Sequence, residues 1–591
     1  MKSVVRAWAE ALLVTAAFAI LAYFYLLPAT RYWVQGRTDL FLSNGNDSLT
    51  FPTQIGILVR AFRERPSLLL YGTVHTTMYN PPAGTGLWIP WIDRILLLVG
   101  AGVAPLEAVP AFYAWALSLL NGAAFYACGR IQGWKKPACF GLALAFAFNP
   151  YTRARLAVHP SLAALYFLPL VFLAIRLIQT RKGWKSGFIA SLSLLGAITT
   201  AHYYWMILIA LLPVLAIQAL WRQRYWRRIL VRLAIASIPA LFLLGWSVSH
   251  PLPPDLVQTG VVQSPTIHSY FLVQFAARPI DYLGQDLMFG LRDWNPARRA
   301  LSEWIVSHLD TSNAWERTNG IRWSLLLAFI GATAVFARRK SREAAFDAPT
   351  RTTLATLLLF TFAAFWLSLS PRSLAPGGHG IGPSLWVHAL LPNFRVPSRF
   401  GPVVHFGLLL FVGTAFEAWR ARARRPASQV AVILLPFLMI LDYPPLEAMP
   451  MQPALPRLLS EECGAGFFVP TLSGEEIGPA GESTTYRWIE RLRGTSCSLL
   501  GGGGPTAANS SFRAAFASVP GSSSADERLL RFVECSGTSW IGFTESLDRV
   551  RDVSDRARLC AKLGFEQEEG ADVCRSRAPR ALNPHWETCT P

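Results

Sequence analysis

The sequence predicts a mainly α-helical fold: a polytopic bundle of membrane-spanning helices, followed by a small α/β domain. Of the 591 residues, 52% are hydrophobic and only 15% are charged, whereas soluble domains carry about 25% charged residues. Uncharged apolar stretches recur from residue 8 to residue 441. The remainder, 445–591, is polar and rich in Gly and Ser, with short strand-like segments such as "GAGFFVP" and "SWIGF".

Eleven apolar segments are predicted to cross the membrane, which assigns residues 1–444 to the helical bundle. A crossing needs roughly 20 residues, and several of these segments are shorter than that. The first follows Lys2 and Arg6, and we interpret it as an uncleaved helix because many more spans follow and no clear small-x-small cleavage site ends it. The segments are 8–28, 106–128, 137–150, 161–178, 186–200, 203–221, 229–248, 322–337, 352–369, 400–419 and 428–441.

Basic residues gather in short clusters between the apolar segments and account for much of the net charge of +19. Cytoplasmic loops carry an excess of Lys and Arg, so we expect these clusters and the amino terminus to face the cytoplasm. This placement argues against nucleic acid as the partner that explains the charge. The clusters are Arg130/Lys135/Lys136, Arg181/Lys182/Lys185, Arg222/Arg224/Arg227/Arg228, Arg338/Arg339/Lys340/Arg342 and Arg420/Arg422/Arg424/Arg425.

The cysteines point to the compartment of the tail. With the amino terminus inside, an odd number of spans places the tail outside. Six of the eight cysteines lie there, and an even number in an oxidising compartment implies up to three disulfides of open connectivity. Free thiols and a metal site are the alternatives, but no Cys-x-x-Cys pair supports a metal. The six are Cys463, Cys497, Cys535, Cys560, Cys574 and Cys589.

Three outer loops are expected, at 29–105, 249–321 and 370–399. Within the first, the segment 87–103 is short and carries Asp93 and Arg94. A lipid-facing ion pair would be costly, so we interpret this segment as an interfacial or re-entrant helix. If it crosses the membrane instead, the parity of the spans changes.

Asp47 is the most informative acid of the first outer loop. It stands in the turn "NGND", and the run that follows places Phe51, Ile55, Ile57, Leu58 and Phe62 at roughly helical spacing. We expect this helix to lie flat on the membrane and to hold the carboxylate near the headgroups. There Asp47 could serve as a base. The alternative is that it only caps the helix or closes an Asx turn.

The chain resembles the GT-C superfamily of integral membrane glycosyltransferases, which includes the protein mannosyltransferases and the bacterial lipid A aminoarabinose transferase. "GNDSL" and "YNPPAG" stand where that family has an acidic motif and a motif with a double proline. The later "LSLSPRSLAPGGHG" and "LLPNFRVPSRFGPVVHFGLLL" resemble bacterial members that have an outer carboxy-terminal domain. The resemblance covers most of the chain, although its motifs are short.

The resemblance implies a fold of GT-C type in the bacterial cytoplasmic (inner) membrane. The implied reaction transfers a sugar from a polyprenyl-phosphate-linked donor, on the outer face, to a cell-envelope glycan, lipid or protein. Asp47 would be the catalytic base. Many members have an Asp-Glu pair where this chain has Asn46-Asp47, and Lys or His where it has Asn80. Asp39 therefore remains a competing candidate.

The lipid phosphate that leaves in such a reaction calls for cations near the outer membrane face. The candidates are Arg395 and Arg399 in "NFRVPSRF" and Arg153 and Arg155 in "NPYTRARLAVHPSL". The alternative for each pair is that it holds a helix end at anionic headgroups. His159 follows Arg153 and Arg155 at the edge of a span.

Two further histidines are candidates. His202 lies within an apolar stretch, where an ionisable group is a functional hypothesis by default and a neutral hydrogen-bonded histidine is the alternative. His75 shares the first outer loop with Asp47. No cofactor is expected. A divalent metal held by Asp47 and His75 is an option that no ligand spacing supports. "GGGG" at 501–504 lacks a phosphate-binding context, so a nucleotide-sugar donor is disfavoured.

Two other functions compete with glycosyl transfer. A transporter or flippase of lipid-linked glycans would show internal repeats and broken helices at matching positions, and the sequence has no convincing repeat. A non-catalytic partner in envelope assembly would explain the missing Asp-Glu pair.

Overall fold

The computed structural model places helices on most of the predicted spans. It describes residues 2–27, 29–42, 51–72, 74–76, 85–87, 89–181, 183–221, 225–250, 272, 275–283, 296–309, 316–370, 383–391, 394, 396–422, 442, 451–453, 464–469, 498–500, 523–543, 553–567, 573–577, 580–584 and 589. Ten of the eleven predicted segments fall on helices. The last, 428–441, lies outside the described residues.

The apolar helices differ in length. Five of those described are long and apolar enough to cross a membrane: α5 (Val109–Ile131), η3 with α8 (Pro160–Ala163 and Phe167–Thr180), α11 (Trp226–Ser249), α16 (Ala348–Ser368) and η7 with α18 (Pro397–Phe400 and Gly401–Arg422). Apolar helical stretches of 10–17 residues are Ala9–Tyr25 within α1 (Lys2–Tyr25), α6 (Lys136–Ala147), α9 (Trp184–Ile198), Tyr203–Ile217 within α10 (His202–Leu220) and α14 (Trp323–Ala337).

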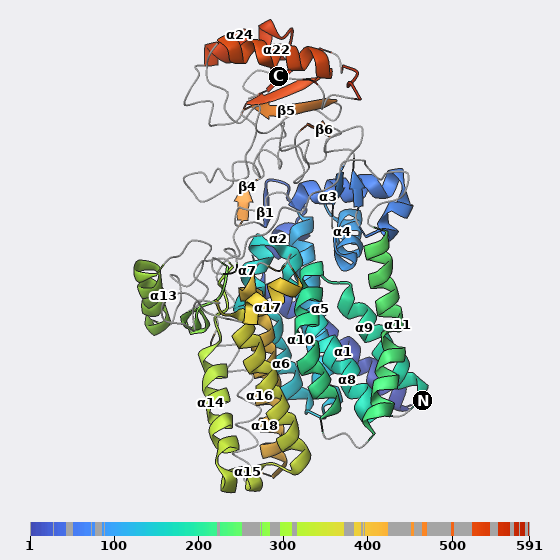
Figure 1. Ribbon diagram of the computed structural model, residues 1–591, viewed down its shortest axis with the longest axis vertical. Helices are drawn as coiled ribbons and strands as arrows, with labels where there is room; N and C mark the ends of the chain where they lie inside the picture. Colours follow the sequence, from blue (N-terminus) through green and yellow to red (C-terminus); the bar gives the residue numbers. More distant parts are fainter. Residues whose placement is uncertain are drawn as a thin grey trace.

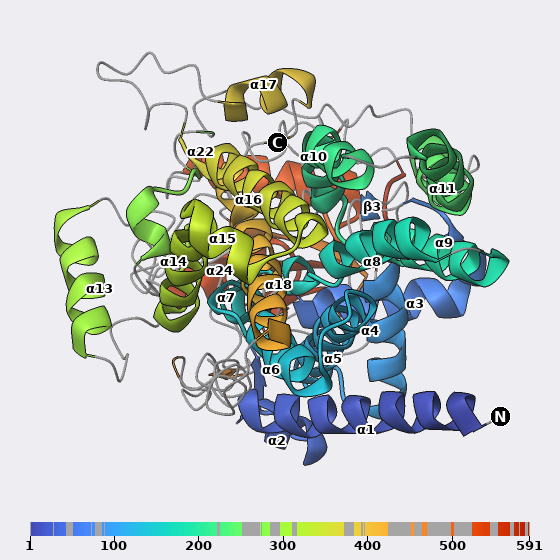
Figure 2. The same ribbon diagram turned by 90° about the horizontal axis from the view of Figure 1, so that it is seen from below.

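Helix α18 lies at the centre of the bundle, packed against α6, α14 and α16 (Figure 2). Close backbone approach makes this packing tight: a Cβ at Gly413 would lie 2.5 Å from the ring of Trp134, which is buried. At the periphery, α11 keeps Ile235, Leu241 and Phe242 more than half exposed. An apolar helix with an exposed apolar face is suited to contact with lipid.

The basic clusters gather at one end of the bundle. Glu10 of α1 pairs with Arg130 and Lys136, at 3.1 and 2.6 Å, and Glu417 of α18 accepts a hydrogen bond from the backbone of Lys135. Arg232 of α11 donates to the carbonyl of Arg181. The helix α15 (Arg339–Ala345) lies at this same end, and the carboxy-terminal sheet lies at the opposite end (Figure 1).

The first outer loop is built from short elements. They are α2 (Ala29–Val34), β1 (Leu40–Leu42), α3 (Phe51–Glu64), η2 (Pro66–Leu70), β2 (Val74–Thr76), β3 (Thr85–Leu87) and α4 (Trp91–Val103). The sequence suggested that the apolar face of α3 lies on the membrane, but the structure covers this face with protein. Phe51, Ile55 and Leu58 are buried, and among these apolar residues only Phe62 is largely exposed. The periodicity revealed a buried face but not what covers it.

Helix α4 has 13 residues, about 20 Å of helix, which is less than the roughly 30 Å of a hydrocarbon core. Its charged residues are buried in the protein rather than exposed. The hydroxyl of Tyr113 donates to Asp93 at 2.6 Å. The guanidinium of Arg94 donates to the carbonyls of Ile89, Leu69, Tyr71 and Gly72, at 2.6 to 2.8 Å.

The polar tail contains a five-stranded sheet of order β6-β5-β7-β9-β8. The strands are β5 (Ala465–Val469), β6 (Ser498–Leu499), β7 (Trp540–Phe543), β8 (Glu566–Gln567) and β9 (Val573–Arg575). Strand β5 is parallel to its neighbours β6 and β7, and β9 is antiparallel to both of its neighbours. Helices α22 (Ser523–Ser536) and α24 (Val553–Lys562) pack on this sheet through Phe532 and Leu559.

Two disulfides join parts of the tail, Cys535–Cys589 and Cys560–Cys574. Cys463 and Cys497 lie outside the described residues. The strand β4 (Met451–Pro453) pairs antiparallel with β1 of the first outer loop, with Phe41 opposite Gln452. The remaining elements are α7 (Pro150–Val158), η5 (Pro279–Tyr282), α13 (Pro296–His308) and α17 (Pro383–Leu390).

Candidate functional site

Helix α7 carries the first pair of predicted arginines, and its sequence fixes both of its ends. Asn149 caps the helix: its side-chain oxygen accepts a hydrogen bond from the backbone of Thr152 at 2.8 Å. Pro150 occupies the first helical position, where its missing N–H costs nothing. The helix ends at His159 because the next residue is Pro160, and a residue before proline disfavours helical backbone. Arg153 and Arg155 are both buried on this short helix.

Glu316 lies at the centre of the site. Its carboxylate accepts hydrogen bonds from Arg155 Nη2 at 2.8 Å, and from Arg399 Nη2 and Nε at 2.5 and 3.2 Å. His159 Nε2 lies 3.8 Å from Glu316 Oε1. We call Arg155, His159, Glu316 and Arg399 the arginine–glutamate cluster. Three of its four members were predicted from the sequence; Glu316 was not.

Burial decides the electrostatics of this cluster. The side chains of Arg155 and Glu316 are 0% and 1% exposed, while those of Arg399 and His159 are 12% and 14% exposed. Burial alone would raise the pKa of Glu316, but the charges of Arg155 and Arg399 outweigh it and hold that pKa at about 2. The carboxylate is therefore ionised at neutral pH, and the cluster keeps a net positive charge.

Aromatic rings support both arginines. The guanidinium of Arg155 lies 4.8 Å from the ring centroid of Tyr151, and that of Arg399 lies 4.5 Å from the ring centroid of Tyr203. Such cation–π contacts stabilise a guanidinium by about 0.5–2 kcal/mol. Tyr203 in turn accepts a hydrogen bond from the backbone of Val396 at 2.7 Å and donates to its carbonyl at 3.0 Å. Helix α10 thus fixes the segment that carries Arg399.

The segment that carries Glu316 is held against η7 and α18. Asn319 donates to the carbonyl of Ser398 at 3.0 Å. This approach requires Gly401, because a Cβ at that position would lie 1.8 Å from the side-chain oxygen of Asn319. Arg322 donates to the carbonyl of Phe148 at 2.6 Å. The cluster is therefore assembled by three segments far apart in sequence, which explains why local patterns did not reveal Glu316.

This arrangement can bind an anion at its exposed edge. Within the described part of the chain, Arg399 uses Nε and Nη2 on Glu316, and its Nη1 makes no hydrogen bond. A guanidinium held from behind by a carboxylate and a ring loses little freedom when an anion binds in front. Arg155 is fully buried and donates to Glu316.

The other predicted residues are placed differently. Asp39 is exposed and forms a bidentate ion pair with Arg37, which lowers the pKa of Asp39. His75 lies in β2, with its backbone opposite Gly86 of β3, and His202 is the first residue of α10. Asp47, Asn80 and Arg395 lie outside the described residues.

No described group of three or more His, Cys, Asp and Glu residues is arranged to hold a metal ion. A divalent metal thus stays an option that depends on Asp47.

Three of the solved structures that resemble the chain belong to the oligosaccharyltransferase of Archaeoglobus fulgidus. The apo form is 11% identical with a TM-score of 0.37, and the match covers 90% of this chain and 69% of that one. The complex with an inhibitory peptide and a dolichol-phosphate is 10% identical with a TM-score of 0.39, and the match covers 98% of this chain and 77% of that one. The complex with Zn and sulfate is 10% identical with a TM-score of 0.39, and the match covers 98% of this chain and 76% of that one. No protein-family model and no curated protein matches the chain.

Proposed function

We propose that the chain is a membrane glycosyltransferase of GT-C type that uses a polyprenyl-phosphate-linked sugar. It transfers the sugar to a cell-envelope glycan, lipid or protein on the outer face of a bacterial cytoplasmic membrane. The observation that carries the proposal is the arginine–glutamate cluster, which lies at the end of the bundle away from the basic loops. A departing lipid phosphate accumulates negative charge, and a fixed cation stabilises it as the bond to the sugar breaks.

The roles divide by exposure. Arg399 and His159 contact the donor phosphate, and Arg155 and Glu316 position Arg399. Arg153 and Arg395 are the remaining phosphate candidates; Arg153 is buried like Arg155, so Arg395 is the one of the two that this division by exposure leaves open. This division follows from the geometry, since only Arg399 and His159 reach the exposed edge of the cluster.

Asp47 is proposed as the base that accepts the proton of the acceptor hydroxyl. Asp39 is the competing acid of the same loop, although its pairing with exposed Arg37 is typical of a surface turn. His75, Asn80 and His202 remain candidates for contacts with the sugar. The proposal requires no metal.

Residues 445–591 are proposed to form an outer α/β domain that positions the acceptor. Two observations support this role. The β1–β4 pair joins the tail directly to the first outer loop, which contains both candidate acids. The disulfides Cys535–Cys589 and Cys560–Cys574 suit an oxidising compartment.

The test is the analysis of lipid-linked sugars and envelope glycans in a deletion strain that is complemented with variants. Asp47→Asn keeps the size of the side chain and still caps a helix. If Asp47 is the base, this variant reaches a normal protein level while transfer falls about 100-fold or more. Asp39→Asn is the matched control and should retain transfer.

The same experiment separates the competing functions. Loss of a transferase leaves the donor lipid accumulated on the outer face of the membrane. Loss of a flippase traps the lipid on the inner face, and that outcome would reject glycosyl transfer. If Asp39→Asn abolishes transfer and Asp47→Asn does not, the base lies in the first outer loop but is Asp39 and not Asp47.

A further inference from the structure

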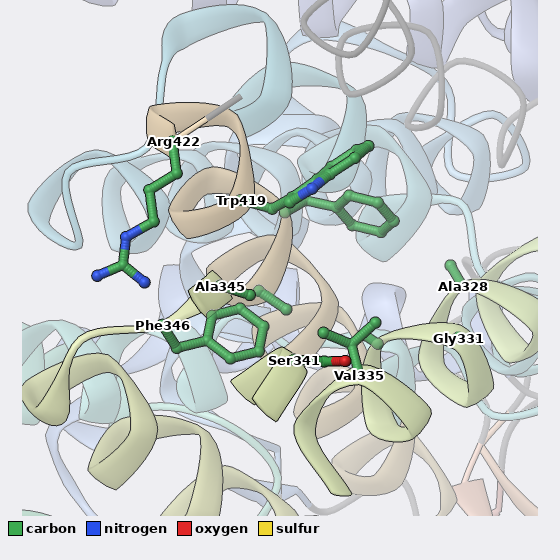
Figure 3. Close-up of a pocket in the computed structure, with 11 residues that line it drawn as sticks. Ala328, Gly331, Val335, Ser341, Ala345, Phe346, Trp419 and Arg422 are labelled. Carbon is green, nitrogen blue, oxygen red and sulfur yellow. The ribbon is translucent and has the colours of Figure 1, made fainter. Parts of the chain in front are cut away.

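A second site lies at the opposite end of the bundle, between α14, α15 and α18. A cavity of about 600 Å³ lies between these helices (Figure 3). Its walls are mostly apolar: Ala328, Ala332 and Val335 come from α14, and Ala415 and Phe416 come from α18. Small side chains on both helices leave the space. A Cβ at Gly331 would meet no atom within 4 Å.

The cavity has one apolar end and one basic end. Figure 3 shows Arg422 at one end and Ala328 and Gly331 at the other. Trp419 lies close to the basic end and is 40% exposed, as is typical of tryptophan at a membrane–water interface. The hydroxyl of Ser341 adds a polar group to the lining.

The charge at the basic end is positive after its acids are counted. Of the described residues, 338–347 and 417–422 hold six basic and three acidic residues. Glu417 is paired with Arg420 at 2.9 Å. Asp347 caps α16 by accepting a hydrogen bond from the backbone of Thr350, and its charge also interacts with Arg422. Arg338 and Arg342 flank this end, and their excess charge favours an anionic group.

The apolar lining of the cavity is short enough to lie within one leaflet. From Ala328 to Val335, the lining residues of α14 rise about 10 Å, which is less than half of the roughly 30 Å hydrocarbon core. Beside the cavity, Leu327 and Ile330 of α14 are 68% and 54% exposed. The cavity thus opens onto a surface suited to lipid contact, with its basic end at the level where headgroups lie.

We propose that this cavity binds an anionic glycerophospholipid, with an acyl chain between α14 and α18 and the phosphate beside Arg422. A free phosphate would leave the apolar length empty. A zwitterionic lipid would gain little from the basic end. The proposal does not depend on the transferase function, because it concerns the other end of the bundle and its test measures binding alone.

The test is native mass spectrometry of the full chain in detergent, titrated with phosphatidylglycerol or phosphatidylcholine of identical acyl chains. The wild type should bind phosphatidylglycerol at least about fivefold more tightly, and Arg422→Gln should remove about that factor. Gly331→Leu fills the open space and should weaken binding of phosphatidylglycerol by about tenfold or more. If Gly331→Leu does not fold, Ala328→Leu fills the cavity further along its length and replaces Gly331→Leu in the test.

Two matched variants provide the controls. Lys185→Gln removes a cation from another basic loop, and Leu327→Phe changes an exposed residue beside the cavity; neither should alter the affinity. Equal affinity for the two lipids, or phosphatidylglycerol binding that survives both Arg422→Gln and a filled cavity, would overturn the proposal. A dimer mass that disappears in Gly331→Leu would instead assign the cavity to a second copy of the chain.

Discussion

Glu316 holds one negative charge between two arginines, and Arg155, which is 0% exposed, cannot be solvated without opening the site. Removing the carboxylate in Glu316→Gln leaves Arg155 buried beside a second cation. Breaking a buried ion pair costs about 3–5 kcal/mol. We therefore expect a loss of this size in the free energy of unfolding, measured in detergent by denaturant titration. The matched control is Glu10→Gln: Glu10 also binds two cations but is 20% exposed, so its loss should cost less than about 1 kcal/mol.

The same carboxylate makes stability depend on pH in the acid range. The pKa of Glu316 in the folded protein is about 2, below its ordinary value of 4.5. Its contribution is therefore complete above about pH 4.5 and is lost as the pH falls toward about 2. The difference in unfolding free energy between wild type and Glu316→Gln should shrink across this window. A difference that stays constant from pH 5 to pH 2 would show that the carboxylate is not held as an ion.

Arg399 is the residue whose replacement tests phosphate binding. Arg399→Ala should weaken donor use by about 1.5–3 kcal/mol, the value of a charge-assisted hydrogen bond. Arg399→Lys should restore it only in part, because the lysine ammonium is a single point charge without the planar fork that lets Nε and Nη2 face Glu316 while Nη1 faces the anion. The measurement is the dependence of transfer on donor concentration in membranes. Full activity of both variants would leave the arginine with a purely structural role.

At this scale the sequence predicted the cations and missed their partner. Arg155 and Arg399 were predicted because a departing lipid phosphate calls for cations near the outer membrane face, and His159 because it follows Arg155 at the edge of a span. Glu316 gave no such signal. Its two ion-pair partners stand 161 and 83 residues away in the chain, and no local spacing encodes contacts of that separation.

Helices were the elements that the sequence predicted best, because long apolar runs have few other structures available in a membrane. What covers each helix was harder to predict. The amphipathic pattern of α3 indicated an apolar face, and the structure covers that face with α4 and α5. Short strands such as β2 and β3 escaped notice because three residues are too few to show alternation.

Arg94 of α4 makes the strongest prediction at the scale of elements. It holds four carbonyls that flank the β2–β3 hairpin, and its removal in Arg94→Met leaves them without a donor. Hydrogen exchange in residues 66–89 should accelerate by about 100-fold, which corresponds to about 3 kcal/mol of local stability. The exposed Arg63 at the end of α3 gives the control, since Arg63→Met should leave exchange unchanged. Equal exchange in both variants would contradict this role of Arg94.

The orientation of the whole molecule across the membrane can be tested by labelling its cysteines. The tail is proposed to lie outside with its cysteines oxidised. A membrane-impermeant maleimide should therefore label the tail in spheroplasts only after reduction, at the exposed Cys535 before Cys560, Cys574 and Cys589, which are buried. The free Cys128 and Cys139 are buried in the bundle and should stay unlabelled throughout. Labelling before reduction, or none after it, would reject an outer disulfide-bonded tail.

The pairing of β1 with β4 imposes an order on biosynthesis. Leu40–Leu42 leaves the ribosome about 400 residues before its partner Met451–Pro453. At about 5–20 residues per second, the first strand waits for roughly 20–80 s. During that time its edge is a template for wrong pairing. A chain that stops before residue 451 never covers it, so nascent or truncated chains are the ones that we expect to need a chaperone on the outer side.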